Sequence, residues 1–171
     1  MPSSECFLLF TRHSVLGTSR AAVPTVKQVI LALDVGDARI GLARGETGSS
    51  FAFGRGFITR TKLGEDIRAL KNLMLEENAD LLVLGLPKSK DGSDSPQTQK
   101  VRAFAKELEK ADVMVVLEDE RFTTRLASQR LQTLPKHKRQ EKGRLDEAAA
   151  VLILESYLAK TNAKSEDCFE A

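Results

Sequence analysis

The stretch Val29-Ile-Leu-Ala-Leu-Asp34-Val-Gly-Asp37 joins a nearly continuous apolar run to a short turn. An apolar run of this length is typical of a β-strand that is buried on both faces. Gly36 and Asp37 have the chemistry of a turn, and residues 39–44 read as the second strand of a β-hairpin. Residues 50–59 alternate loosely and continue the meander as a third strand. We therefore expect three antiparallel strands at the start of the ordered chain.

Predicted helices alternate with short apolar runs in the rest of the chain. Leu63, Ile67, Leu70 and Met74 recur at helical spacing, which gives one amphipathic helix a single apolar stripe. Alternation of buried strands with helices indicates parallel strand pairing. We predict an α/β fold with a mixed five-stranded sheet, an antiparallel three-strand meander plus parallel strands, flanked by helices on both faces. The other expected elements are strands at 81–84 and 113–117, and helices around 101–108, from Thr123 or Thr124 to about Leu134, and from Asp146 to about Lys160.

Length and composition suit one globular domain. The chain has 171 residues, of which 42% are hydrophobic and 29% charged, enough to build a core. No apolar run approaches the roughly 18 residues that a membrane span needs. Cys6 and Cys168 form neither a disulfide framework nor a CxxC pair, which fits a reducing, cytoplasmic setting, and two histidines exclude a His-rich metal site. We expect residues 1–27 to be a poorly ordered extension and residues 161–171 a loose acidic tail.

Three acidic residues occupy places where a ligand site is expected. Asp34 ends a buried strand, Glu120 follows another, and Asp146 opens the last predicted helix. Ligand sites in sheets of this kind gather beyond the carboxyl ends of the strands. Converging carboxylates can hold two divalent ions about 3.5–4 Å apart, an arrangement that hydrolyses phosphodiesters. Gly36 and Gly41 would leave space for a phosphate to approach the backbone, or would serve only the hairpin. Each acid also has a structural interpretation, such as an Asx turn at Asp34 or a favourable helix N-terminal charge at Asp146.

Four sequence blocks follow one another along the chain. They are Asp34-Val-Gly-Asp-Ala-Arg-Ile-Gly-Leu-Ala43; Gly85-Leu-Pro87 with Asp91-Gly-Ser93; Asp119-Glu-Arg-Phe-Thr-Thr124 with Ala127; and Asp146-Glu-Ala-Ala149 with Ile153 and Tyr157-Leu158. Taken in this order, the blocks resemble those of the YqgF (RuvX) family of RNase H-like nucleases, which are related to RuvC-type Holliday junction resolvases. The resemblance covers residues 29 to about 160, and the second and third blocks together are specific.

The resemblance implies an RNase H-like nuclease domain over residues 28–160. It also implies that Asp34, Glu120 and Asp146 are the catalytic acids and hold Mg²⁺ or Mn²⁺, with two ions expected. Arg39 and Arg121 match basic family positions and would contact phosphate or orient the acids, although Arg121 could equally pair with Asp119. Further expected nucleic-acid contacts are Lys88, Lys90, Thr123 and Thr124, with helix capping as the alternative for the threonines.

A basic run precedes Asp146 in the sequence. Residues 136–144 hold five basic residues and one acidic residue, so the chain's net charge of +2 conceals a local excess of positive charge. Such a run is either a solvated linker or a phosphate-binding strip, and its place beside a predicted catalytic acid favours the strip. Because the chain has only one Tyr, eight Phe and no Trp, we expect backbone recognition rather than base stacking. The basic residues of the run are Lys136, Lys138, Arg139, Lys142 and Arg144.

The function that these observations predict is that of a metal-dependent endonuclease acting on structured nucleic acid. The family offers two substrates, Holliday junctions in branched DNA and the 5′ end of pre-16S rRNA, and the acids do not separate them. Resolution of a symmetric junction would favour a homodimer, whereas a monomer suffices for RNA processing. The alternatives are a non-catalytic nucleic-acid-binding module and an Asp-x-Gly phosphotransferase or ATPase-like domain. The chain holds one Asp-x-Gly strand and no Walker A loop, which disfavours the second alternative.

Overall fold

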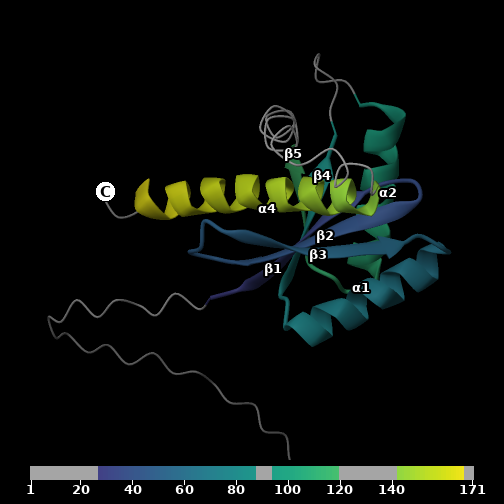
Figure 1. The fold of residues 1–171 in the computed structure, drawn as a ribbon, viewed down its shortest axis with the longest axis horizontal. Helices are drawn as coiled ribbons and strands as arrows, with labels where there is room; N and C mark the ends of the chain where they lie inside the picture. Colours follow the sequence, from purple (N-terminus) through teal and green to yellow (C-terminus); the bar gives the residue numbers. More distant parts are fainter. Residues whose placement is uncertain (1–26, 88–93, 120–141, 168–171) are drawn as a thin grey trace, which may run out of the picture.

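Five strands form one mixed sheet in the computed structural model, which describes residues 27–87, 94–119 and 142–167. The strand order is β3-β2-β1-β4-β5 (Figure 1). β1 pairs antiparallel with β2, and β2 with β3, while β1–β4 and β4–β5 are parallel. The predicted mixed sheet is therefore confirmed. The strands are β1 (Val29–Val35), β2 (Arg39–Glu46), β3 (Ala52–Thr59), β4 (Leu81–Leu86) and β5 (Val115–Asp119).

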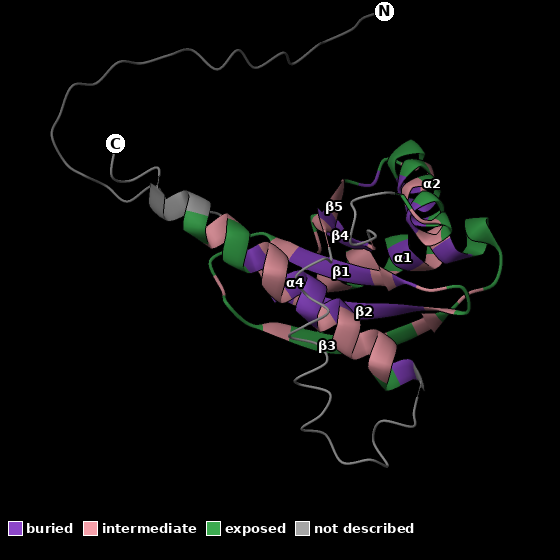
Figure 2. Cartoon of the chain, turned by 90° about the horizontal axis from the view of Figure 1, so that it is seen from above, coloured by how far each residue is buried: buried purple, intermediate pink, exposed green. Residues whose placement is uncertain are grey.

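Helices cover both faces of this sheet, as predicted (Figures 1 and 2). On one face lie α1 (Leu63–Glu77) and α2 (Pro96–Lys110), and on the other lies α4 (Lys142–Asp167). β1 explains why the sequence forms two cores. Its residues Leu31 and Leu33 pack toward α1 and α2, whereas Ile30 and Ala32 pack toward α4, and all four are fully buried. No helix among the described residues is long and apolar enough to cross a membrane.

The end of α2 explains why the start of β5 was predicted wrongly. Val113 was expected to begin this strand, which starts at Val115. Asp112 has a left-handed backbone with φ of 60°, and its N–H donates to the carbonyl of Glu109 at 3.0 Å. The N–H of Val113 donates to the carbonyl of Leu108 at 3.1 Å, which completes a Schellman cap. Val113 thus ends the helix instead of opening the strand.

Both predicted limits of the last helix were also wrong. α4 is helical from Lys142, four residues before Asp146, and it continues past Lys160 to Asp167. Residues 161–167, expected as part of a loose tail, are helical backbone. The early start coincides with a tertiary contact, because Gly143 packs against the ring of Phe57 on β3. The helix predicted between Thr123 or Thr124 and Leu134 lies outside the described residues.

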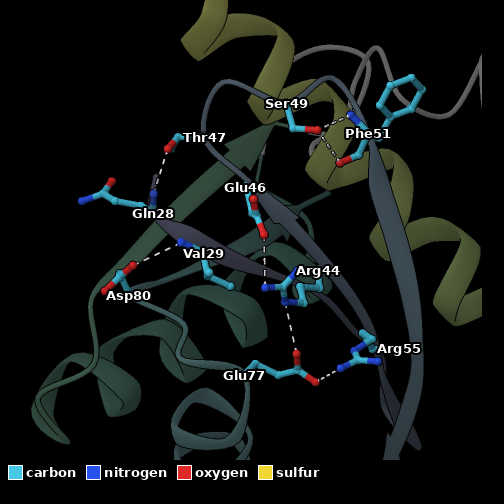
Figure 3. Close-up of polar contacts among 10 residues, drawn as sticks. All are labelled: Gln28, Val29, Arg44, Glu46, Thr47, Ser49, Phe51, Arg55, Glu77 and Asp80. Atoms are coloured by element: carbon cyan, nitrogen blue, oxygen red, sulfur yellow. Dashed lines mark hydrogen bonds and ion pairs between the residues drawn. The ribbon is translucent and has the colours of Figure 1, made fainter. Parts of the chain in front are cut away.

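Polar contacts tie the end of α1 to the sheet (Figure 3). Glu77, whose side chain is only 14% exposed, forms ion pairs with Arg44 of β2, whose Nε lies 3.2 Å from Oε2 of Glu77, and with Arg55 of β3. Next along the chain, Asp80 Oδ2 accepts from the N–H of Val29 at 3.1 Å. These contacts fix the hairpin strands against α1, so the other face of β2 is presented to α4.

Candidate active site

Asp34 lies near the carboxyl end of β1, in the centre of the sheet. It is partly buried between the buried residues Leu33 and Val35. In the antiparallel register with β2, its Cα partner is Gly41. The side chain therefore projects from the central strand of the sheet, and a site built on a strand holds its geometry better than one built on a loop.

Gly41 brings the last helix onto this position. A Cβ added to Gly41 would overlap the main-chain carbonyl of Asp146 in α4, so only glycine allows the helix to approach β2 so closely. Because Gly41 is the register partner of Asp34, this contact places Asp146 beside Asp34. We interpreted Gly41 from the sequence as leaving space for a phosphate. The structure corrects this interpretation, since the helix backbone occupies that space.

The two carboxyl groups influence each other electrostatically. The pKa of Asp34 is raised to about 6, first by burial of the carboxyl group and second by the negative charge of Asp146. A carboxylate that is buried beside a second acid is unfavourable without a positive charge. The pair is therefore suited to receive a cation.

Arg39, the first residue of β2, is the cationic side chain found next to Asp146. Its Nη1 lies 3.9 Å from Oδ2 of Asp146, and both side chains are about one-third exposed, at 33% and 32%. Its guanidinium also lies over the ring of Phe57, 5.2 Å from the ring centroid. At 3.9 Å the ion pair is loose, so the guanidinium retains donors for a phosphate. This placement is compatible with both roles predicted for Arg39.

Three side chains hold the turn that follows Asp34, one from the segment before α1 and two from α2. Arg60 Nη1 donates to the carbonyl of Gly36 at 3.1 Å, and Gln97 Nε2 donates to the carbonyl of Val35 at 2.8 Å. Lys100 Nζ donates to Asp37 Oδ1 at 2.7 Å, and this hydrogen bond, together with the lysine charge, lowers the pKa of Asp37. Main-chain carbonyls of the turn are thus occupied by protein donors, which fixes the backbone around Asp34.

The third predicted acid, Glu120, lies outside the described residues. Asp119, which precedes it, ends β5. Pairing of Leu33 with Leu84 and of Leu84 with Leu117 shows that β1, β4 and β5 end at the same edge of the sheet. Eight predicted contact residues also lie outside the described part of the chain, and their roles stay predictions: Lys88, Lys90, Arg121, Thr123, Thr124, Lys136, Lys138 and Arg139.

The basic run reaches the described structure only at its end. Lys142 and Arg144 belong to the first turn of α4, and the side chain of Arg144 is exposed. Gly143, between them, is buried against Phe57. The run therefore ends at Arg144, two residues before Asp146.

Asp34 and Asp146 are the described residues that fit a divalent cation. Their oxygen donors suit a hard ion such as Mg²⁺. Burial and, second, the charge of Asp146 disfavour the ionised form of Asp34, and a bound cation would stabilise that form. In residues 27–87, 94–119 and 142–167, no group of three or more His, Cys, Asp or Glu is arranged to hold a metal. The described part of the site thus supplies two ligands, and the predicted third is Glu120.

The sequence did not single out two residues that shape this site. Phe57 lies against Arg39 and Gly143, and 45% of its surface is exposed. Glu147 Oε1 accepts from the N–H of Gly56 at 3.1 Å, which joins α4 to β3. The motif around Asp146 already contained Glu147, but an exposed Phe on an edge strand gives no signal of its own.

Comparison with known proteins identifies clear relatives. A family model described as "RuvX: Holliday junction resolvase" matches residues 28–160. A Thermus thermophilus protein named "Putative pre-16S rRNA nuclease" is 50% identical over 129 residues, which cover 75% of this chain and 96% of the relative. "Ribonuclease YqgF" of Deinococcus radiodurans is 43% identical over 152 residues, which cover 89% of this chain and all of the relative.

Solved structures with much lower sequence identity share the fold. Thermus thermophilus RuvC in complex with a Holliday junction substrate matches with a TM-score of 0.51 at 12% identity, over 78% of this chain and 96% of that chain. The yeast mitochondrial Holliday junction resolvase matches with a TM-score of 0.52 at 12% identity, over 82% and 83% of the two chains. The fold is therefore the RNase H-like fold of these resolvases, as the sequence predicted.

Proposed function

This chain belongs to the RuvX family and is a nuclease, and we propose that it hydrolyses phosphodiester bonds in structured nucleic acid with divalent metal ions held by Asp34, Glu120 and Asp146. The observation that carries this proposal is the meeting of Asp34 and Asp146 through Gly41. A silent binding module would not require this second acid. The family match and the relatives named as nucleases support the same activity.

Mg²⁺ or Mn²⁺ bound to these acids would stabilise the charge of the reacting phosphate and activate water. The chain's own residues prepare the site for this chemistry. Asp34 is held by a central strand and by a turn whose carbonyls are bonded to Arg60 and Gln97. Because the pKa of Asp34 is about 6, the carboxyl group is mostly ionised above neutral pH and protonated in mild acid. Arg39 orients Asp146 or binds a phosphate oxygen of the substrate.

Pre-16S rRNA is the first substrate to test, because the relative at 50% identity carries that name. A four-way DNA junction is the second, because the family description and the solved RuvC complex name it. A symmetric junction presents two equivalent strands, so junction resolution would be favoured in a homodimer. We also infer a cytoplasmic location, because the bacterial relatives are named for an RNA that is made in that compartment.

The experiment is a cleavage assay on both substrates. Wild-type protein is mixed with a pre-16S rRNA 5′ fragment or with a four-way junction, in Mg²⁺, Mn²⁺ or EDTA. Asp34→Asn and Asp146→Asn are run beside Asp37→Asn, a matched control from the same turn whose side chain is exposed and paired with Lys100. We expect metal-dependent cleavage by wild type and Asp37→Asn, and a loss of at least 100-fold in both site variants, a size typical of groups that stabilise a transition state.

The outcomes separate the alternatives. Cleavage of one substrate alone identifies the physiological class of nucleic acid. Binding of both substrates without cleavage in any metal would support the non-catalytic module. Cleavage that survives Asp34→Asn and Asp146→Asn would remove both residues from the metal site.

A further inference from the structure

We propose that Phe57 is a stacking platform for an unpaired nucleobase of the bound strand, next to the catalytic acids. This inference rests on the proposed nuclease function and adds a base contact to it. It also revises the expectation, drawn from the few aromatic residues, that recognition uses the nucleic-acid backbone alone. Three observations carry it: the exposure of Phe57, its contacts, and the bulge that aims it.

Phe57 is an exposed aromatic side chain held by the active site. It leaves 45% of its surface in solvent, although burial of a Phe side chain stabilises the folded state. One part of its ring is in contact with Gly143, where any added Cβ would overlap the ring. The ring is therefore braced by the first turn of α4 and cannot rotate freely into solvent, and a fixed ring is a good surface for stacking.

Arg39 joins this ring to the acids. Its guanidinium lies 5.2 Å from the ring centroid of Phe57, while its Nη1 lies 3.9 Å from Oδ2 of Asp146. A phosphate near Asp146 is thus within reach of the same guanidinium that covers Phe57. Since a base lies only a few bonds from its own phosphate, a strand bound at the acids would bring a base to Phe57. An aromatic ring beside an arginine accepts any base, because every base has a π-face.

A β-bulge in β3 directs Phe57 to the face of the sheet that α4 covers. Ala43 of β2 pairs with Gly54 and Gly41 pairs with Phe57, so a step of two residues in β2 meets a step of three in β3. Gly56, with φ of 77°, provides the backbone conformation that such a bulge needs. In a regular strand, Phe53 and Phe57 would lie on the same face of the sheet, because they are four residues apart. The extra residue of the bulge places them on opposite faces.

Phe53 shows the consequence of the bulge. Its register partner in β2 is Arg44, whose side chain forms an ion pair with Glu77 of α1. Phe53 therefore lies on the face of the sheet opposite α4. Phe53 is 64% exposed, more than Phe57, and comes from the same strand. Exposure alone would make both residues equivalent, but only Phe57 lies on the face that carries Asp146. Phe53 is therefore a matched control.

The test uses the absence of tryptophan from the chain. Phe57→Trp and Phe53→Trp each create a single fluorophore on one face of β3. Each protein is titrated with a single-stranded oligonucleotide and with the same sequence as a duplex, with Ca²⁺ replacing Mg²⁺ to prevent cleavage. Binding is measured separately by the anisotropy of a label on the oligonucleotide. We expect the single strand to quench the tryptophan at position 57 by at least half, the duplex to quench it less, and position 53 to change little.

A second measurement uses the wild-type ring. Phe57→Leu keeps an apolar side chain against Gly143 but removes the stacking surface, so it should weaken single-strand binding about tenfold, whereas Phe53→Leu should not. Binding by anisotropy with no quenching at position 57 and no loss in Phe57→Leu would overturn the stacking inference and leave the nuclease proposal intact. Absence of binding by the wild-type chain to either nucleic acid would contradict both.

Discussion

The ionised form of Asp34 destabilises the folded state of the metal-free protein. Its pKa is raised from 3.8 to about 6, so the folded state holds this proton more tightly than the unfolded state does. As pH rises from about 4 to 6, the unfolded chain loses the proton first, and the free energy of unfolding falls. Above about pH 6, both states have lost the proton, and the free energy of unfolding falls no further. Binding a cation at Asp34 would offset this destabilisation, which links the function of the residue to its stability.

We therefore predict that Asp34→Asn stabilises the metal-free protein at pH 8. The neutral amide removes the buried charge, and the gain should be on the order of 1–3 kcal/mol. The measurement is urea unfolding in EDTA at pH 8 and at pH 4.5, where the difference from wild type should shrink. Asp37→Asn is the control, because Asp37 is exposed and bonded to Lys100, so its replacement should not stabilise the protein. A destabilised Asp34→Asn at pH 8 would show that the charge is already compensated.

At the scale of elements, the contact between α4 and β2 assembles the site. Gly41→Ala places a methyl group on the main chain of Asp146, so the helix must move away from β2. We predict a loss of stability of about 2–4 kcal/mol and a loss of cleavage. Gly64→Ala in α1 is the matched control, since nothing lies within 4 Å of an added Cβ there, and alanine favours helix.

These two variants are compared by thermal unfolding and by cleavage of the better substrate. Gly64→Ala should be as stable as wild type or slightly more stable, and fully active. If Gly41→Ala were equally stable and active, α4 would not rest on β2 as described.

The first turn of α1 supports the Asp34 turn through Arg60. Asp66, which is 2% exposed, accepts from Arg60 Nε at 3.2 Å, and Arg60 also donates to the carbonyl of Gly36. Asp66→Asn should cost about 2–4 kcal/mol, because it leaves Arg60 without its charged partner. Its exposed neighbour Glu65 is the control, and Glu65→Gln should cost less than 1 kcal/mol. Equal unfolding midpoints for the two variants in urea would argue against this support.

The sequence predicted the element types because apolar runs and helical spacing depend on local residues. The predictions that were wrong concern element boundaries and residue roles that depend on contacts between elements. Val113 is apolar like a strand residue, yet it closes the cap of α2. Asp146 is typical of a helix start, yet α4 starts earlier, where Gly143 meets Phe57. Gly41 was assigned to a phosphate and instead admits the helix, and the direction of Phe57 depends on a bulge that spacing does not reveal.

At the scale of the whole molecule, the small net charge of +2 hides a division of charge. Asp34 lies near the carboxyl edge of the sheet beside Asp146, and the basic run ends two residues before Asp146. Replacing Lys138, Arg139 and Lys142 by Gln should weaken nucleic-acid binding and lower the slope of log K against log salt by roughly 2 to 3. The measurement is fluorescence anisotropy between 50 and about 300 mM salt.

The control for that variant removes the same amount of charge from the other face. Lys62, Arg68 and Lys106 are exposed on or next to α1 and α2, and their replacement by Gln should change the slope much less. Equal slopes for both triple variants would return the basic run to the role of a solvated linker.

The central claim is that Asp34 and Asp146 hold a divalent cation together. Its most direct test is a calorimetric titration of Mn²⁺ into the wild-type chain, Asp34→Asn, Asp146→Asn and the control Asp37→Asn at pH 8. We predict saturable binding by wild type and Asp37→Asn, and affinity at least tenfold weaker in each of the other two variants, since each removes one oxygen ligand and one negative charge. Unchanged Mn²⁺ affinity in Asp34→Asn and Asp146→Asn, or no binding by the wild-type chain, would contradict the claim.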